Sequence, residues 1–407
     1  MTRSATFSPL AHRMFALAMA GVLLTNLGNA IQSVGASWLL TANGEPADIV
    51  ALVQTAINLP IMLLALPAGA WADMHNRRRI ILTAQVGMLS ISLVLAWLAL
   101  SGDAPAAAVL TLTALLACGI ACFSPAMGAS IGSTVPRTEL AAAVALNILI
   151  FNTARAVGPA MGGAIVSFGG STTAFLVNAA SYLLAIGIYL RWRPTQDLPQ
   201  TRRPLGSMIA EGLRHAATTP QIRTIFLRAL TFTMTGAAAW ALMPLVSKDM
   251  LHSGSTVYGI LLGSLGAGAV LGAASATFFR ARYSAEVITR SAGLIYGLAC
   301  IGVALQPSLP AMVALLVLAG AGWVQALSGF SVAAQLWAPR EVVGRIVALA
   351  SAVTFGGIAF GSWLWGHFAE DYGVANAIMA SGAGMVILPL IGFLLPMPAH
   401  EAPQPSA

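Results

Sequence analysis

The chain has 407 residues, of which 58% are hydrophobic and only 8% are charged, whereas soluble proteins carry about 25% charged residues. This composition excludes a soluble globular protein and indicates a chain whose solvent is lipid. The formal net charge of +7 does not indicate a nucleic-acid partner, because the arginines lie in short breaks between apolar runs and form no continuous basic face. Cys118, Cys122 and Cys300 lie inside apolar runs, which favours small core residues over a disulfide framework or a metal pair.

Twelve apolar stretches are long enough to cross a membrane as helices, for which about 20 mainly apolar residues are needed. They cover residues 14–40, 49–71, 80–100, 106–131, 140–168, 172–190, 222–247, 256–279, 285–305, 309–334, 346–368 and 375–396. Their continuous apolar runs favour helices over a β-barrel, whose strands would alternate. The first run is too long for the core of a signal peptide, so we expect it to remain as a span.

The charged residues between these spans predict their orientation. The arginine-containing breaks all fall on the side of the two termini. The opposite side carries one basic residue, Lys248, and six acids: Glu45, Asp48, Asp103, Asp249, Glu370 and Asp371. Because cytoplasmic loops are enriched in Lys and Arg, we expect both termini in the cytoplasm.

One long polar connection divides the chain into six predicted spans and six more. It reads RWRPTQDLPQTRRPLGSMIAEGLRHAATTP. The predicted units are therefore an N-terminal half, residues 1–190, a cytoplasmic linker, residues 191–221, and a C-terminal half, residues 222–407. The piece SMIAEGLRHAA has the pattern of a short amphipathic helix on the membrane surface, and a plain linker remains the alternative.

The two halves repeat each other at a shift of 203 residues. Basic and Pro-Arg positions agree at this shift: Arg77 and Arg79 with Arg280 and Arg282, and Pro136-Arg137 with Pro339-Arg340. Six spans followed by six in the same orientation predict parallel halves related by an axis along the membrane normal.

This architecture, together with GAWADMHNRRR after the second span, resembles the major facilitator superfamily over nearly the whole chain. The family signature at this place is Gly, three residues, Asp, a basic residue, any residue, Gly and two basic residues. The matching positions are Gly69, Asp73, Arg77 and Arg78, while Met74 replaces a basic residue and Asn76 replaces a Gly. Asn is an ordinary residue that tolerates a left-handed backbone well.

The resemblance implies that this turn is a conformational latch on the cytoplasmic side. Asp73 would accept hydrogen bonds from backbone amides at the start of the eleventh span, where the helix dipole favours an acid. Arg77 and Arg78 would hold the turn at the anionic leaflet. In the alternative interpretation, the arginines only set the topology.

The fifth predicted span contains ARAVGPAMGGAIV. Gly158, Pro159, Gly162 and Gly163 resemble the end of a motif associated with antiporters of this superfamily, although Ala145 and Ala154 stand where earlier glycines occur. Small residues at this spacing let helices approach closely, and the Pro removes a helix hydrogen bond. The resemblance implies an exporter with limited proton leak, and ordinary close packing is the alternative.

Further stretches, among them NLGNAIQSVGASWLLT and VPRTEL, look most like the enterobactin-exporter and multidrug-efflux branch of the superfamily.

Polar groups in the middle of the spans are candidates for a substrate path, because they are costly in lipid and usually face a cavity. Arg155 is the clearest, and Asn152 lies one turn away from it. The other candidates are Asn29, Gln32, Gln54, Asn58, Trp240 and Gln325. The alternative for the amides is that they join helices, and for Arg155 that it is a structural anchor.

None of the thirteen acids lies in the middle third of a span. This disfavours a cation antiporter with a membrane-centred carboxylate and favours a neutral or anionic substrate attracted by Arg155. Proton coupling would then use Asp73, His367 near the outer end of the eleventh span, or competition at Arg155. His367 titrates in a suitable range, and a packed polar group is the alternative.

We therefore expect a multi-pass secondary active transporter of the inner membrane that works as a monomer by alternating access. Its expected cargo is an amphiphilic small molecule, siderophore-like or drug-like, exported by the proton gradient. A proton-coupled importer is the alternative, and a non-transporting membrane sensor is disfavoured by the short linker. An enzyme is not expected, because GASIG at 128–132 ends a predicted span without the strand-turn-helix elbow that its G-x-S-x-G pattern requires. No cofactor or metal is expected.

Overall fold

The computed structural model describes residues 5–192, 205–305, 308–339 and 342–398, and within them helices are the regular secondary structure. The first group of helices is η1 (Ala5–Ala11), α1 (Arg13–Ala42), α2 (Ala47–Met74), α3 (Arg77–Ser101), α4 (Ala106–Ile131), η2 (Arg137–Glu139) and α5 (Leu140–Arg191). The second group is α6 (Leu205–Thr218), α7 (Pro220–Gly236), α8 (Ala238–Ala241), α9 (Met243–Leu245), η3 (Val246–Met250), α10 (Ser255–Arg280), α11 (Ala285–Leu305), α12 (Leu309–Leu336), α13 (Val343–Tyr372) and α14 (Val374–Leu394).

Nine helices within the described residues are long and apolar enough to cross a membrane. One of them, α5, contains two of the predicted spans. Gly170 lies between them with φ 71° and ψ 179°, which is not helical. Only glycine adopts such a positive φ readily, so the helices predicted at 140–168 and 172–190 lie on either side of this residue.

The prediction of a single helix over 222–247 was wrong. The structure has a succession of shorter pieces there, α7, α8, α9 and the π-helical η3. Pro244 lacks the N–H that would bond to the carbonyl of Trp240, and Leu242 between the pieces has ψ −1°. A proline inside a helix removes one bond and displaces the backbone, which explains the interruption.

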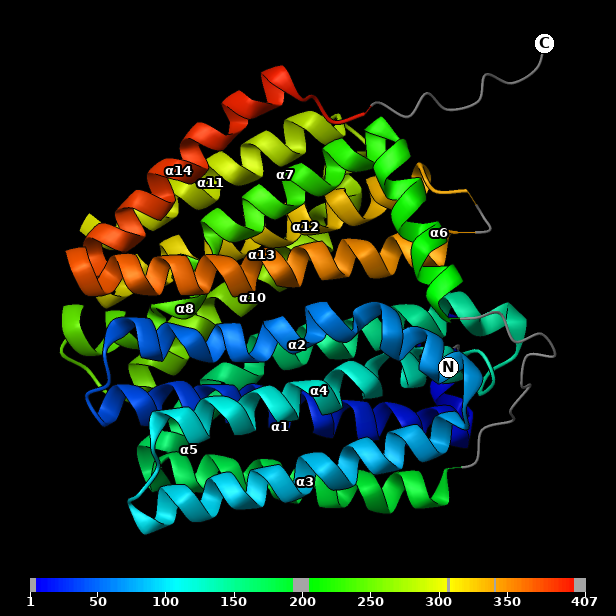
Figure 1. Ribbon diagram of the computed structural model, residues 1–407, viewed down its shortest axis with the longest axis horizontal. Helices are drawn as coiled ribbons and strands as arrows, with labels where there is room; N and C mark the ends of the chain where they lie inside the picture. The colour runs from blue at the N-terminus through cyan, green and yellow to red at the C-terminus, as the bar shows by residue number, and fades with distance from the viewer. Residues whose placement is uncertain (1–4, 193–204, 306–307, 340–341, 399–407) are drawn as a thin grey trace.

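The helices form two bodies that lie one above the other in Figure 1, α1 to α5 below and α7 to α14 above. Within the first body α1 packs on α5, and within the second α10 packs on α12 and α11 on α14. The two bodies meet along two pairs, α2 with α13 and α5 with α10. The second pair approaches closely at glycines, since an added Cβ at Gly163 would lie 2.6 Å from the Cα of Gly259 and one at Gly266 would lie 2.4 Å from the Cα of Ala156.

The two ends of the bundle differ in charge. At one end, here called the basic end, lie η1, α6 and the connections from α2 to α3 and from α12 to α13 (Figure 1). It carries Arg77, Arg137, Arg280 and Arg345. The other end, called the acidic end, holds the connections from α1 to α2, from α3 to α4 and from α13 to α14. Glu45, Asp103, Asp249 and Glu370 belong to it.

The linker does form a helix at the predicted place. α6 contacts α13, α7 and α2 and crosses the basic end of the bundle in Figure 1. Its Glu211 accepts a hydrogen bond from Arg345 Nη1 at 2.5 Å, which fixes it to the first turn of α13.

Candidate functional site

The clearest candidate site is a contact between the two bodies in the part of α5 that precedes Gly170. The guanidinium carbon of Arg155 lies 5.7 Å from the ring centroid of Phe151 and 5.4 Å from the Trp240 ring. Both distances are within the range of cation–π attraction. Trp240 belongs to α8, so this pair joins the N-terminal body to the C-terminal body. Within the described residues Arg155 has no hydrogen-bond or ion-pair partner, so its N–H donors are available.

A cluster of aromatic side chains lies behind Trp240. The ring of Trp323 is 6.0 Å from Trp240 and 5.4 Å from both Phe232 and Tyr296. Tyr296 donates its hydroxyl to the carbonyl of Gly236 at 2.6 Å. The indole Nε1 atoms of Trp240 and Trp323 are buried and find no acceptor among the residues that the structure describes. An indole N–H is a donor only, so both of these buried groups are hydrogen-bond donors without an acceptor in the described part of the chain.

The interruption of the chain after α7 positions Trp240. Because α8 is a short piece between two breaks, its side chains are not held on the face that a continuous helix would present. Discontinuous helices of this kind form substrate sites in several transporter folds. The sequence identified Arg155 and Trp240 separately, and the structure brings them together.

The amides of α1 lie elsewhere. Gln32 is 3% exposed and accepts from Ser92 Oγ at 2.6 Å, and it also accepts from Asn178. Asn29 accepts from the hydroxyl of Tyr182. These bonds join α1 to α3 and to the second part of α5, so both amides lie among helix-to-helix contacts within the first body.

The remaining predicted path residues are held within their own bodies. Asn58 donates to the carbonyl of Gln54 at 2.6 Å, one turn earlier on α2. Gln325 donates to Gly272 O at 2.9 Å and to Ser275 Oγ at 3.2 Å, which joins α12 to α10. Asn152 is half-buried and lies one turn from Arg155 on α5.

The predicted latch lies at the basic end, where α2 ends and α3 begins. Gly69 and Asp73 belong to the last turns of α2, and the side chain of Asp73 lies outside the described part of the structure. Asn76 has φ −64°, so it does not use a left-handed backbone; instead its Oδ1 caps α3 by accepting from Arg79 N at 3.0 Å.

The two arginines of the latch bond to carbonyls of neighbouring helices. Arg77 Nη1 donates to Ala129 O at 3.0 Å, near the end of α4. Arg78 donates to Tyr189 O at 3.2 Å and to Leu190 O at 2.6 Å, at the end of α5. Cations are favourable at helix C-termini, so these bonds fix the turn within the first body.

The predicted glycine motif is a packing surface on two sides. An added Cβ at Gly158 would lie 2.5 Å from Ala30 Cβ, and one at Gly162 would lie 3.1 Å from Ile31 Cα. Both therefore face α1. Gly163 faces α10 of the other body, where the carbonyl of Pro159 lies 2.9 Å from a Cβ built on Gly259. The motif thus packs α5 against α1 of its own body and against α10 of the other body.

His367 and the cysteines form no centre of their own. The exposed ring of His367 stacks on Trp363 at 6.4 Å. Groups of three or more His, Cys, Asp or Glu side chains that could hold a metal ion are absent from the described residues.

Comparison with known proteins now identifies the family. The family model described as transmembrane secretion effector, within the major facilitator superfamily, matches residues 4–407. The chain belongs to this family. It is 27% identical over 398 residues to the multidrug efflux pump Tap of Mycobacterium tuberculosis, covering 93% of each chain. It is 25% identical over 339 residues to the enterobactin exporter EntS of Citrobacter koseri, covering 80% of this chain and 78% of that one.

Solved structures agree on the fold. A bacterial homologue of the human lysosomal transporter Spinster matches with a TM-score of 0.76 and 15% identity over 95% of this chain and 97% of that one. The predicted resemblance to the superfamily and to its efflux branch is confirmed. The chain is a multi-pass membrane transporter and not an enzyme.

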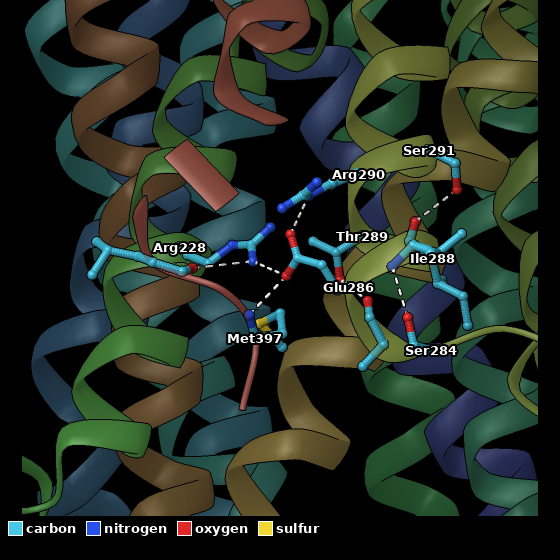
Figure 2. Close-up of polar contacts among 11 residues, drawn as sticks. Arg228, Ser284, Glu286, Ile288, Thr289, Arg290, Ser291 and Met397 are labelled. Atoms are coloured by element: carbon cyan, nitrogen blue, oxygen red, sulfur yellow. Dashed lines mark hydrogen bonds and ion pairs between the residues drawn. The ribbon is translucent and has the colours of Figure 1, made fainter. Parts of the chain in front are cut away.

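Two groups of contacts in this transporter were not predicted from the sequence. Figure 2 shows the first, in which Glu286 of α11 binds Arg228 of α7 and Arg290 of its own helix. The backbone N of Met397 donates to the same carboxylate at 2.7 Å, so this acid joins α7, α11 and the segment after α14. The second group lies at the acidic end, where Lys248 and Glu370 reach the first body. In the sequence, both residues indicate only the orientation of the spans, through their charges.

Proposed function

We propose that this transporter exports an amphiphilic small molecule across the inner membrane by alternating access, driven by the proton gradient. The observation that carries the proposal is the contact of Arg155 with Trp240. It lies at the centre of the chain's two bodies and must change when they rock against each other. The named activities of the relatives, multidrug efflux and enterobactin export, favour export as the direction.

The topology we propose has twelve spans in two six-helix halves, residues 1–190 and 222–407, joined by the linker 191–221. Gly170 divides α5 into two spans, and α7 to η3 form one discontinuous span. An even number of spans agrees with the place of η1 and of the segment after α14, which both lie toward the basic end in Figure 1. Since basic loops stay in the cytoplasm, we assign the basic end to that side. The protein is proposed to work as a monomer.

The substrate class follows from the free polar atoms around Arg155. A central arginine costs at least about 2.5 kcal/mol in a membrane, and this one lies over the rings of Phe151 and Trp240. The indole N–H groups of Trp240 and Trp323, unpartnered within the described residues, add two donors in the aromatic cluster behind this contact. An acceptor such as a carboxylate or a phenolate would pair with the guanidinium, and a ring on the same molecule would stack on Trp240. A catecholate has both features. A lipophilic cation offers no acceptor for these donors, and the residues named at this contact include no carboxylate that would attract it.

We propose that one contact controls opening on the cytoplasmic side and that another limits proton leak. Asp73, with Gly69, Arg77 and Arg78, is proposed to bind the start of α13 when the transporter opens outward. The glycine motif of α5 is proposed to hold the two bodies in tight contact and so to limit proton leak.

Transport into proteoliposomes with an imposed pH gradient tests this function. A catecholate and a lipophilic cation are compared, with Arg155→Gln and the exposed Arg214→Gln as a matched control. We expect gradient-driven movement of the catecholate, a loss of at least about tenfold with Arg155→Gln, and no change with Arg214→Gln. Movement of the cation alone, or equal loss of both substrates, would overturn the role of Arg155. If the substrate moves in the same direction as the protons, down the proton gradient, the protein is an importer instead.

A further inference from the structure

Two charged side chains of the second body bind the first body where α1 ends and α2 begins. Glu370 Oε2, at the end of α13, accepts from the backbone N of Ala47 at 2.7 Å. Lys248 Nζ, from η3, donates to the carbonyl of Thr41 at 2.6 Å. Both bonds therefore hold the ends of the same short connection between α1 and α2.

The charges match the helix ends that they touch. Ala47 is the first residue of α2, and Thr41 lies in the last turn of α1. An anion is favourable at a helix N-terminus and a cation at a C-terminus, and hydrogen bonds to charged groups are stronger than neutral ones. The residue before α2 is Pro46, which provides no side-chain cap. Glu370 therefore satisfies an N–H that the first body leaves without a partner.

The surroundings of these bonds include both a close contact between the bodies and an open cavity. Nearby, an added Cβ at Gly366 of α13 would lie 2.5 Å from Ala51 Cβ of α2. A cavity of about 480 Å³ opens beside it and is lined from both bodies, by Glu45, Lys248, Glu370 and Tyr372 among others. Water in that cavity can replace the two hydrogen bonds when they break, which lets them act as a reversible contact.

We propose that Glu370 and Lys248 form the latch that closes the acidic end, and that both bonds break each time the transporter opens on that side. This acidic-end latch is the counterpart of the turn at Asp73, which is proposed for the opposite end and the opposite conformation. The inference rests on alternating access from the proposed function, and it is independent of the substrate and of the direction of transport.

The first test measures the opening of the acidic end directly. Spin labels at Asn43→Cys in the first body and Thr256→Cys in the second report the distance between them, in a protein whose three native cysteines are replaced by alanine. We expect Glu370→Ala and Lys248→Met to raise the population of long distances by about tenfold each relative to the closed form. Glu370→Gln should have a smaller effect, because its amide oxygen still accepts from Ala47.

Asp371→Asn is the matched control, since this neighbouring acid is exposed and bonds to no side chain or backbone group within the described residues. It should leave the distances unchanged. If Glu370→Ala and Lys248→Met give the same distances as the parent protein, or if Asp371→Asn shifts them equally, the latch is wrong.

A second test uses the fact that Lys248 is the single lysine of the chain. A membrane-impermeant amine-reactive ester added outside modifies only this side chain, and peptide mass spectrometry measures the rate. Glu370 and Lys248 form no hydrogen bond or ion pair with each other within the described residues, so an increase of several-fold in Glu370→Ala would show that breaking one bond frees the other. An unchanged rate would contradict a common latch. Neither test needs a substrate, so a failure of export leaves the latch testable, and a failure of the latch leaves export testable.

Discussion

The two ends of the helix bundle differ in how the bodies meet. At the acidic end, charged side chains of the second body bond to the backbone of the first, through Glu370 and Lys248. At the basic end, Arg77 and Arg78 bond within the first body, and Arg280 donates to Ser328 within the second. The hydrogen bonds named here thus bridge the bodies at the acidic end, and those of Arg77, Arg78 and Arg280 lie within a single body at the basic end.

The glycines show the same difference. A Cβ added at Gly163 or Gly366, toward the acidic end, would collide with the opposite body. A Cβ added at Gly69 or at Gly344, beside the predicted latch and the start of α13, would meet no atom of the described residues within 4 Å. The conformation described is therefore tightly packed between the two bodies toward the acidic end.

The largest effect should come from preventing closure at the acidic end. Gly163→Ala places a Cβ 2.6 Å from the backbone of Gly259, which can only be relieved by moving α5 away from α10. Overpacking of this kind typically costs 1–3 kcal/mol, so we expect transport to fall by at least about tenfold and the closed form to be depopulated. Spin labels at Asn43→Cys and Thr256→Cys check the second effect.

Gly187→Ala is the control for this prediction, because it lies on the same helix and an added Cβ there meets no atom within 4 Å. It should transport normally. Normal transport by Gly163→Ala as well would mean that the two bodies do not need to close at this crossing.

A smaller, opposite effect is expected at the basic end. Asp73→Asn removes the charge that the superfamily resemblance assigns to the start of α13. Binding of substrate should stay largely intact while turnover slows by about tenfold, since a charged hydrogen bond contributes about 1.5–3 kcal/mol. Labels at Thr138→Cys and Tyr283→Cys should show fewer molecules closed at the basic end. A collapse of binding with an unchanged conformational balance would contradict the latch.

The different charges of the two ends of the bundle could be predicted from the sequence, but the hydrogen bonds between the bodies could not. Apolar length and the position of the arginines predicted the spans and the basic end, because both are properties of a single segment. The break around Trp240 was missed, since Pro244 lies in a run that is apolar throughout. The helix faces also could not be assigned, so Gln32 was expected on the path although it lies in a buried network.

Glu370 and Lys248 illustrate why the acidic-end latch could not be predicted. Their partners are backbone groups of Ala47 and Thr41, which lie 323 and 207 residues away in the chain. A backbone partner has no side-chain identity, so no pairing of opposite charges marks the contact in the sequence. The missing side-chain cap at Pro46 is the single local signal that could have been used.

The smallest effect is predicted for the linker helix, and it tests whether the basic end is restrained by more than the turn at Asp73. Glu211 of α6 bonds to Arg345 in the first turn of α13, which is the helix start that Asp73 is proposed to bind. The side chains are 39% and 17% exposed, and exposed ion pairs contribute about 0–1 kcal/mol. We therefore expect Glu211→Gln to change turnover by no more than about threefold.

The direction of that change is informative. If α6 holds the start of α13 away from the turn, Glu211→Gln raises the population closed at the basic end, as measured with labels at Thr138→Cys and Tyr283→Cys. The effect should shrink as salt is raised, because screening already weakens the pair in the parent protein. Arg214→Gln, on the exposed side of the same helix, should do nothing. A lower closed population in Glu211→Gln would instead make α6 part of the closing contact, and the two ends would then be bridged in the same way.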